Sequence, residues 1–358
     1  MDRKHISSED GKIKIAYKDI EQVCICLLPY PLLQYLLLNE LDMCKHHTAY
    51  FLDESVNQSI KNNLPTIHYQ NYYPSTFFNK VFRKIKRLYQ VLTRYIRYPF
   101  LKHAKIYAQD ARFFSILIGS REYGLLEDGP DFLSRVFSKD SIWQKDIEKR
   151  SHSLSGKIEK AIYGVPYVYK YGNNNQCKYI YSTKEINSPY LASRNICVNS
   201  FQSLWNSSSE EKRQFILDVF NVTPEDIYIF KQKPIIYFSQ PLDTDFHIDT
   251  NQYVTILEKI LSQYDHSQVL FKTHPRDTFN YEKYFPNIMF YRKPVNLQLL
   301  LLLGISFKKA VTTFSTAVYD LPEEIEVDWF GPSIHPNTLE YCGKELYPPR
   351  SYNQVYLN

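Results

Sequence analysis

A histidine beside a proline is the first residue whose position suggests chemistry. It is His274, which stands before Pro275 and Arg276 in "FKTHPRD" (271–277). The preceding "QVLFK" (268–272) is apolar enough for a strand, and a strand's carboxyl end is where α/β sheets bind their ligands. His274 is therefore a candidate site residue. A surface or capping histidine is the alternative, because ring nitrogens often only satisfy nearby backbone groups.

Two acidic segments each supply a candidate general base. In "LLEDGPDF" (125–132), Glu127 and Asp128 directly follow an apolar run, and Gly129 turns the chain. A carboxylate at such a strand end can take a proton from an acceptor hydroxyl. An ordinary polar turn is the alternative, because Asp-Gly is common in turns.

The second acidic segment is "YFSQPLDTDF" (237–246). Here an apolar strand and a proline are followed by Asp243 and Asp245. The arrangement supports the same chemistry and has the same turn-like alternative.

Hydroxyl side chains follow a further predicted strand in "TTFSTAVYDL" (312–321). Ser315 and Thr316 come just before residues that can begin a helix. Hydroxyls and free backbone N–H groups at a helix start can bind an anion. A serine that only caps the helix is the alternative.

Length and composition indicate a globular protein of two domains. The 358 residues are 44% hydrophobic and 23% charged. The most apolar stretch (23–38) falls short of the roughly 20 residues of a membrane span, and Pro29 and Pro31 interrupt it. We expect a strand at 22–28, a Pro-Tyr-Pro turn and a helix from about 32 to 43.

The spacing of the cysteines and the absence of several known motifs exclude further classes of function. The six cysteines include no CxxC pair and lack metal-ligand spacing, and the sequence shows no secretion signal. We therefore expect reduced thiols, a cytoplasmic location and no metal site. Dinucleotide-binding, P-loop and nucleophile-elbow motifs are absent.

One segment is strongly basic. Residues 55–109 contain ten Lys and Arg but no Asp or Glu. Within it, the pattern at 80–97 predicts a helix with Ile85, Leu88 and Leu92 on one apolar face and basic residues on the others. Such a helix can lie on an anionic membrane, or it can be a solvated helix packed through its apolar stripe. Nucleic acid is not expected, because no base-reading motif accompanies the charge.

Strand and helix patterns alternate in two series. The first contains strands at 22–28, 48–53, 104–109 and 123–129, and a helix near 142–162. The second contains strands at 234–239, 268–272, 285–292 and 309–313, and helices at 250–264 and 296–305. This alternation predicts parallel sheets covered on both faces. We therefore expect two Rossmann-like domains, 16–205 and 232–340, with a cleft between them.

In this order the segments resemble glycosyltransferase family 52, the bacterial sialyltransferases of lipooligosaccharide and surface polysaccharide assembly. The likeness runs from about 22 to 330. The matching motifs are the acidic Glu127-Asp128-Gly129, the QP segment "YFSQPLDTD", His274-Pro275-Arg276 and Ser315-Thr316-Ala317.

The resemblance implies a GT-B fold with the active site in the cleft, CMP-sialic acid bound mainly by the C-terminal domain, and no metal. His274, Arg276 and the Ser315–Thr316 helix start would stabilise the departing CMP. Pro275 and Gln298 are further donor-binding candidates. Gln298 lies where related enzymes often have a glutamate, and it can form hydrogen bonds without carrying charge.

The resemblance also implies an inverting transfer to a terminal sugar, galactose being the expected acceptor, on a surface glycan that a lipid can carry. Asp128 and Asp243 both remain candidates for the base, with Glu127, Gly129 and Asp245 beside them. Two other functions stay open. One is transfer from another nucleotide sugar, such as a UDP-hexose. The other is a non-catalytic basic protein that binds anionic lipid or polysaccharide through 55–109.

Overall fold

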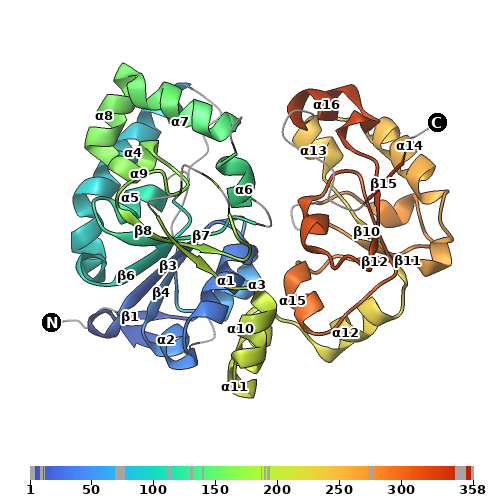
Figure 1. Cartoon of the computed structure of the whole chain (residues 1–358), viewed down its shortest axis with the longest axis horizontal. Coiled ribbons are helices and arrows are strands. Elements are labelled where there is room, and N and C mark those ends of the chain that lie inside the picture. Colours follow the sequence, from blue (N-terminus) through green and yellow to red (C-terminus); the bar gives the residue numbers. More distant parts are fainter. Residues whose placement is uncertain are drawn as a thin grey trace. The chain divides into compact units, whose positions relative to one another are not determined.

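The computed structural model describes most of the chain. The described residues are 5–8, 11, 13–68, 77–110, 114–129, 132–138, 141–186, 188, 191, 194–274, 277–342 and 352–355, with only the backbone described at 68, 77–83, 320 and 354. The chain divides into two compact units, Met1–Asn221 and Val222–Asn358. Each unit is described by itself, and Figure 1 gives the element labels.

The first unit contains a parallel sheet that has seven strands within the described residues. Its strands are β3 (Gln22–Cys26), β4 (Thr48–Leu52), β5 (Thr66–His68), β6 (Lys105–Ala108), β7 (Tyr123–Leu126), β8 (Cys177–Ser182) and β9 (Asn195–Val198). The spatial order is β5-β4-β3-β6-β7-β8-β9. The order therefore reverses at β3, so that β3 and β6 are neighbours at the switch point of the sheet. A separate antiparallel pair joins β1 (His5–Ser7) and β2 (Lys14–Ala16).

Helices cover both faces of this sheet (Figure 1). They are α1 (Pro29–Leu38), α2 (Leu41–His46), α3 (Gln58–Asn62), α4 (Phe77–Arg97), α5 (Ser115–Ile118), α6 (Phe132–Val136), α7 (Ile142–His152), α8 (Leu154–Tyr163), α9 (Val165–Val168), α10 (Phe201–Ser207) and α11 (Glu210–Val219). Single 3-10 turns lie at Tyr17–Asp19 and Pro99–Lys102. Because both faces are covered, β4 is buried along its whole length, as expected for a central parallel strand.

The predicted Pro-Tyr-Pro turn is wrong. Pro29 is the first residue of α1, and Pro31 also lies in its first turn. Prolines fit there because the first N–H groups of a helix have no partner within the helix. The helix then ends at Leu38, and α2 begins at Leu41 instead of continuing to residue 43. The expected helix near 142–162 is likewise two helices, α7 and α8, which meet at Ser153.

The second unit also contains a parallel sheet, with six strands among the described residues. They are β10 (Ile235–Phe238), β11 (Val269–Lys272), β12 (Met289–Tyr291), β13 (Lys309–Thr312), β14 (Glu326–Trp329) and β15 (Asn353–Gln354). Their order, β12-β11-β10-β13-β14-β15, again reverses at the first strand, which places β10 beside β13. Ligands of such sheets bind at the carboxyl ends of the strands near this reversal.

The helices of the second unit are α12 (Pro224–Lys231), α13 (Leu242–Phe246), α14 (Thr250–Leu261), α15 (Leu297–Leu302) and α16 (Pro336–Cys342). Short 3-10 turns lie at His266–Gln268, Tyr281–Lys283, Thr316–Asp320 and Pro332–Ile334. An aromatic core supports β11, where the Phe271 ring lies 4.6 Å from Tyr237 and 4.5 Å from Tyr281. In the part of the chain that the structure describes, no helix combines the length and apolar character needed to cross a bilayer.

Candidate active site

His274 lies just beyond the carboxyl end of β11, and its backbone is tied to the neighbouring strand. The N–H of Ser239, the residue after β10, donates to the carbonyl of Lys272 at 3.1 Å. The hydroxyl of Ser239 in turn accepts a hydrogen bond of 2.8 Å from the N–H of His274. The half-buried His274 is thus held at the carboxyl edge of the sheet, beside the strand at which the order reverses.

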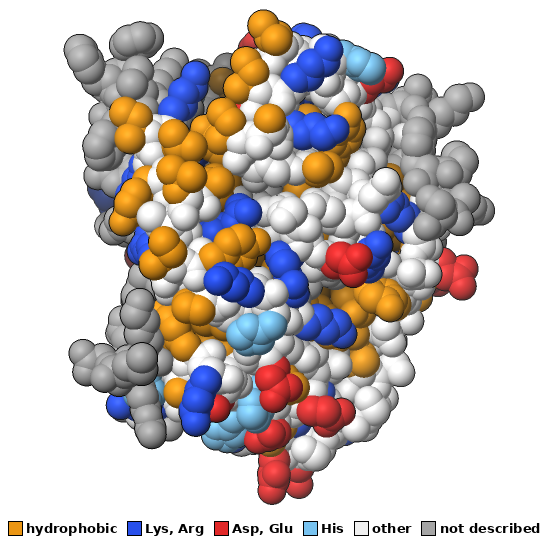
Figure 2. Space-filling view, turned by 90° about the vertical axis from the view of Figure 1, so that its left-hand side faces the viewer, with side chains coloured by type: hydrophobic (Ala, Val, Ile, Leu, Met, Phe, Trp, Pro, Cys, Tyr) orange, Lys and Arg blue, Asp and Glu red, His pale blue; other side chains and the backbone are white. Residues whose placement is uncertain are grey.

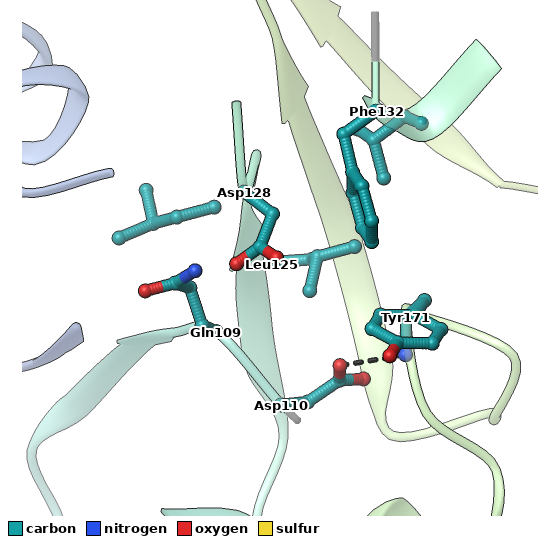
Figure 3. A pocket seen from close by; sticks show the side chains of 8 residues that line it. Gln109, Asp110, Leu125, Asp128, Phe132 and Tyr171 are labelled. Carbon is teal, nitrogen blue, oxygen red and sulfur yellow. Dashed lines mark hydrogen bonds between the residues drawn. The ribbon is translucent and has the colours of Figure 1, made fainter. Parts of the chain in front are cut away.

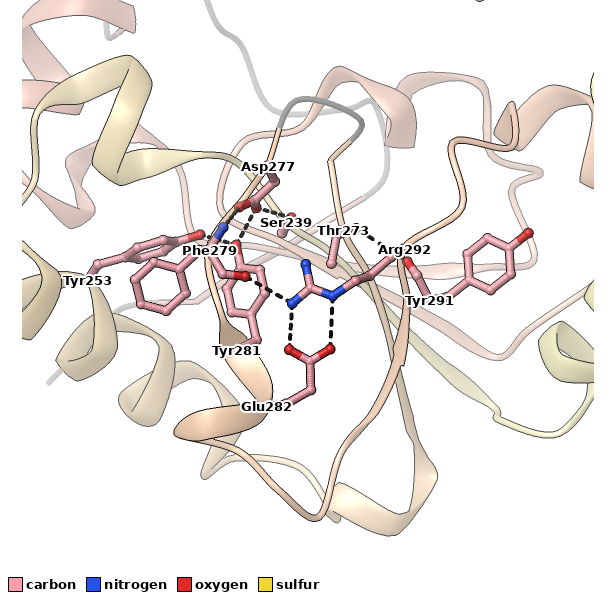
Figure 4. Close-up of polar contacts among 9 residues, drawn as sticks. All are labelled: Ser239, Tyr253, Thr273, Asp277, Phe279, Tyr281, Glu282, Tyr291 and Arg292. Atoms are coloured by element: carbon pink, nitrogen blue, oxygen red, sulfur yellow. Dashed lines mark hydrogen bonds and ion pairs between the residues drawn. The ribbon is translucent and has the colours of Figure 1, made fainter. Parts of the chain in front are cut away.

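The Asp277 carboxylate, three residues after His274, is the centre of a polar network (Figure 4). Asp277 accepts hydrogen bonds from the Ser239 hydroxyl at 3.0 Å and from the Phe279 N–H at 3.0 Å. The Tyr281 hydroxyl also donates to Asp277. Burial, followed by the Asp277 charge, raises the pKa of Tyr281, so this phenol remains a proton donor. The network fixes both ends of the segment 274–277.

A buried lysine precedes this loop. Lys272 is the last residue of β11, and burial lowers its pKa to about 8. Its register pairs it with Phe238 and Tyr291, so its side chain shares their face of the sheet. A cation with reduced hydration at this edge favours an anionic ligand.

Asp243 and Asp245 both lie in the short helix α13, which follows β10. Each is half-buried. The Oδ1 atom of Asp243 is buried and has no hydrogen-bond partner among the described residues. A buried carboxylate oxygen without a partner is uncommon, since such groups are normally satisfied. Asp243 is therefore available to accept a proton or hydrogen bond from a ligand.

Ser315 caps the 3-10 turn Thr316–Asp320. Its Oγ atom accepts from the Ala317 N–H at 3.4 Å, and its own N–H donates to Thr312 Oγ1 at 3.0 Å. The predicted helix start is thus a single 3-10 turn with a serine cap, and the half-buried Thr316 is its first residue. Because one turn has a much smaller dipole than a full helix, it is a weaker anion site than expected.

Gln298 lies in the first turn of α15, and its side chain is buried. The side chain of Asn296 caps this helix by accepting from the Gln298 N–H at 2.8 Å. Pro275 and Arg276 lie outside the described residues.

In the first unit, Glu127 has a structural role. It is buried after β7, and its Oε2 atom accepts hydrogen bonds from the N–H and the hydroxyl of Thr183, both at 2.9 Å. Its own N–H donates to Gln34 Oε1 at 2.9 Å. These contacts join the ends of β7 and β8 to α1, which makes Glu127 a poor candidate for a proton acceptor.

Asp128 lines a small cavity that it shares with Gln109 and Asp110 (Figure 3). Asp128 and the next residue, Gly129, are half-buried beyond the end of β7. Asp110 is completely buried, and burial raises its pKa to about 6 although the Tyr123 hydroxyl and the Gly172 N–H donate to it. Asp110 therefore positions the loop at Gly172.

Gln109 is the most informative residue of this cavity. Its Oε1 atom accepts from the N–H groups of Leu27 and Leu28, which follow β3 at the switch point of this sheet. These bonds fix the orientation of the amide. Its Nε2 atom is buried and has no hydrogen-bond acceptor among the described residues. Gln109 thus carries an unused donor beside Asp128.

The structure places the candidates in two groups. Asp243, Asp245, His274, Gln298, Ser315 and Thr316 belong to the second unit, and Glu127, Asp128 and Gly129 belong to the first. Sequence reasoning missed Ser239, Lys272, Asp277 and Gln109. The first three stand within or beside the QP and HP segments, so polar residues flanking those motifs were the available signal. Among the described residues, no cluster of three or more His, Cys, Asp or Glu side chains could hold a metal ion.

Comparison with known proteins gives a family match. The model of glycosyltransferase family 52 matches residues 43–336. An uncharacterized protein of Haemophilus influenzae is 27% identical over 272 residues, which are 76% of this chain and 81% of that protein.

Solved structures with a similar fold include bacterial sialyltransferases. An α/β-galactoside α-2,3-sialyltransferase of Photobacterium phosphoreum aligns with a TM-score of 0.55 and 11% identity, covering 86% of this chain and 90% of that one. The GT-B domain of a Photobacterium damselae sialyltransferase aligns with a TM-score of 0.52 and 13% identity, covering 86% of this chain and 90% of that one. A Photobacterium 2,6-sialyltransferase solved with CMP and lactose aligns with a TM-score of 0.53 and 12% identity, covering 86% of this chain and 71% of that one. These likenesses confirm the predicted GT-B fold.

Proposed function

Because the chain belongs to glycosyltransferase family 52, we propose that it is an inverting sialyltransferase that uses CMP-sialic acid as donor. The acceptor is a terminal sugar, galactose in the first instance, of a bacterial surface glycan. The observation that carries the proposal is the position of His274, which Ser239 and Asp277 hold at the carboxyl edge of the second sheet. The CMP and lactose bound to the Photobacterium 2,6-sialyltransferase support the choice of donor and acceptor.

His274 acts on the departing nucleotide. When the bond between sialic acid and CMP breaks, negative charge develops on the single phosphate of CMP. A histidine can donate a proton or hydrogen bond to that phosphate and so stabilise the transition state. Since only one phosphate departs, the reaction needs no metal ion to bridge two phosphates.

Lys272 adds to the recognition of the donor. Its pKa of about 8 means that it carries a positive charge below this pH and loses it above. The donor is an anion, because it has a phosphate and a carboxylate. Donor affinity is therefore expected to fall as the pH rises through about 8.

Asp243 is the preferred base. It follows β10, the strand that neighbours β11, so it lies in the same unit and along the same sheet edge as His274. Its unsatisfied Oδ1 atom can accept the proton of the acceptor hydroxyl while that oxygen attacks the anomeric carbon of sialic acid. Asp128 is the competing candidate, and mutation separates the two.

Gln109 binds the acceptor. The cavity beside Gln109 measures about 10 Å³, so its fixed amide donates through Nε2 to a single water, which can pass the hydrogen bond on to a sugar hydroxyl. The neighbouring Asp128 can accept a hydrogen bond from the same sugar. A donor and an acceptor side by side are the usual means of holding a sugar hydroxyl. In this account Asp128 and Gln109 together orient the sugar hydroxyl.

Equilibrium binding tests the donor assignment before any turnover is measured. We would titrate CMP, UDP and GDP into the full-length protein by isothermal calorimetry, below and above pH 8. CMP should bind more tightly than the other nucleotides, and its affinity should fall at the higher pH. Lys272→Met should weaken CMP binding and remove the pH dependence, whereas Lys233→Met, at the opposite end of this sheet, should change neither. Preferential binding of UDP would instead assign a UDP-sugar as donor.

A further inference from the structure

The outward face of α4 is apolar. Ile85, Leu88, Leu92 and Ile96 are 61%, 44%, 69% and 71% exposed. Their spacing places them along one side of the helix. The predicted apolar stripe therefore exists, but its side chains point to the surface instead of packing against the protein.

Two arginines hold α4 in this orientation. The Arg87 guanidinium is buried and donates to the Tyr167 hydroxyl at 2.7 Å, and Arg94 donates to the Ile116 carbonyl at 2.8 Å. Val91, between them, packs on the small core formed by Ile116, Tyr163, Tyr167 and Val168. Rotating the helix to bury its aliphatic face would break both arginine contacts, so the exposed face is a built feature of the fold.

The neighbouring helix α8 extends the apolar surface. It packs beside α4, and its residues Leu154, Ile158 and Ile162 are 76%, 51% and 40% exposed. We call the exposed residues of the two helices the α4–α8 face. Figure 2 shows this side of the molecule, with hydrophobic and basic side chains interspersed in its upper part and acidic ones gathered below. Large apolar side chains exposed together on one face mark an interaction site.

The charges around the α4–α8 face are almost all positive. Lys84, Arg97, Lys157 and Lys160 are exposed on the two helices. Residues 84–97 contain no acid, and Glu159, the one acidic residue of α8, pairs with Arg150 at 2.7 Å. A partner that matches this face therefore has a negatively charged surface with apolar material directly below it.

We propose that the α4–α8 face docks the protein on the surface of an anionic lipid bilayer. The leucines and isoleucines enter the boundary between headgroups and acyl chains, while the lysines and arginines contact the lipid phosphates. A second copy of the chain fits less well, because a symmetric contact would bring the same cations face to face. Attachment of this kind would concentrate the protein where lipid-borne glycans are found, but the inference does not depend on the proposed function.

Co-sedimentation with vesicles tests the proposal on the full-length protein without any substrate. One set of vesicles is pure phosphatidylcholine, and the other contains equal parts of phosphatidylcholine and phosphatidylglycerol. The protein should sediment with the anionic vesicles and not with the neutral ones. Binding should weaken at high ionic strength, because the Debye length falls from about 10 Å at 0.1 M to about 3 Å at 1 M salt.

Two triple variants separate the apolar and the basic contributions. Leu88, Leu92 and Ile96→Ser should abolish sedimentation with anionic vesicles, and Lys84, Arg97 and Lys157→Gln should reduce it strongly. The matched controls change exposed residues of the second unit, namely Tyr228, Leu339 and Tyr341→Ser, and Lys231, Lys259 and Lys283→Gln. Both controls should bind like the wild type, and circular dichroism should show the same secondary structure in all variants.

Three results would overturn the proposal. The first is a wild-type protein that fails to bind anionic vesicles. The second is binding that survives both triple variants of the α4–α8 face. The third is a stable dimer in sedimentation velocity that Leu88, Leu92 and Ile96→Ser converts to a monomer, which would make this face a contact between two copies.

Discussion

The main-chain N–H of His274 donates a 2.8 Å hydrogen bond to Ser239 Oγ, and this bond joins the ends of two neighbouring parallel strands. The Ser239 hydroxyl in turn donates a 3.0 Å hydrogen bond to Asp277, so one hydroxyl contacts both His274 and Asp277. The position of the imidazole therefore depends on the backbone contacts at the ends of the two strands. A catalytic group held in this way loses little freedom when the transition state forms.

His274→Ala should lower kcat for sialyl transfer by about 10²–10⁴, the range for loss of a positioned acid or charge-stabilising group. His266→Ala is the matched control, because His266 lies at the opposite, amino end of β11. That control should retain normal turnover. Near-normal activity in folded His274→Ala would remove the histidine from the mechanism.

Ser239→Ala should lower kcat about tenfold, because the His274 N–H and one oxygen of Asp277 lose a buried partner. Ser239→Thr keeps the hydroxyl and should restore most of the activity. Thermal stability alone would not distinguish a positioning role, so kcat and KM are measured separately. A loss that Ser239→Thr does not rescue would contradict the role of the hydroxyl.

Asp243→Asn should reduce transfer by about 10²–10⁴ while CMP still binds, because the change removes the proton acceptor and keeps the shape of the side chain. Asp128→Asn should chiefly raise the KM for the acceptor sugar. The two variants are compared by initial rates over a range of acceptor concentrations. The reverse pattern would make Asp128 the base, and mild losses in both would exclude both assignments.

Gln109→Glu should raise the acceptor KM about tenfold without changing CMP affinity. The carboxylate can still accept from the Leu27 and Leu28 N–H groups, but it cannot donate to a sugar hydroxyl. Acceptor titrations at saturating donor measure the effect. An unchanged acceptor KM would show that the Nε2 donor does not face the sugar.

Asp226→Asn should destabilise the second unit by about 1–3 kcal/mol near neutral pH. Burial alone would raise the pKa of Asp226, but hydrogen bonds from Lys293, Thr223 and Tyr291 lower it below its ordinary value. A lowered carboxyl pKa stabilises the folded state above the ordinary pKa, and this contribution is lost as the pH falls through the folded-state value. The difference in denaturant midpoint between wild type and variant should therefore shrink in acid. A difference that stays constant with pH would contradict the ion pair.

The sequence predicted those helices and strands whose formation depends on residues adjacent in the chain. The apolar runs of β10 and β11 were read correctly, because strand formation there depends on adjacent residues. The strands β8 and β14 were missed because their residues mix polar and aromatic types, and they are stabilised by pairing with β7 and β13. Tertiary contact overrides weak local preference in such strands.

The site could be predicted only in part for the same reason. The HP and QP segments pointed to His274 and Asp243, but the contact from Ser239 to Asp277 spans 38 residues and appears only once β10 and β11 are paired. The orientation of α4 could not be predicted from the sequence either. Its periodicity showed an apolar stripe, whereas the contacts of Arg87 and Arg94 decide that the stripe faces outward.

The most direct test of the central claim is acceptor-dependent turnover across a panel of donors. The full-length protein is incubated with lactose and with CMP-sialic acid, UDP-galactose, UDP-glucose or UDP-N-acetylglucosamine, and both the released nucleotide and the product sugar are followed. We predict that CMP is released together with sialylated lactose, that the UDP-sugars are left intact, and that His274→Ala suppresses the reaction while His266→Ala does not. Transfer from a UDP-sugar with CMP-sialic acid left unchanged, or equal rates in the two histidine variants, would contradict the account.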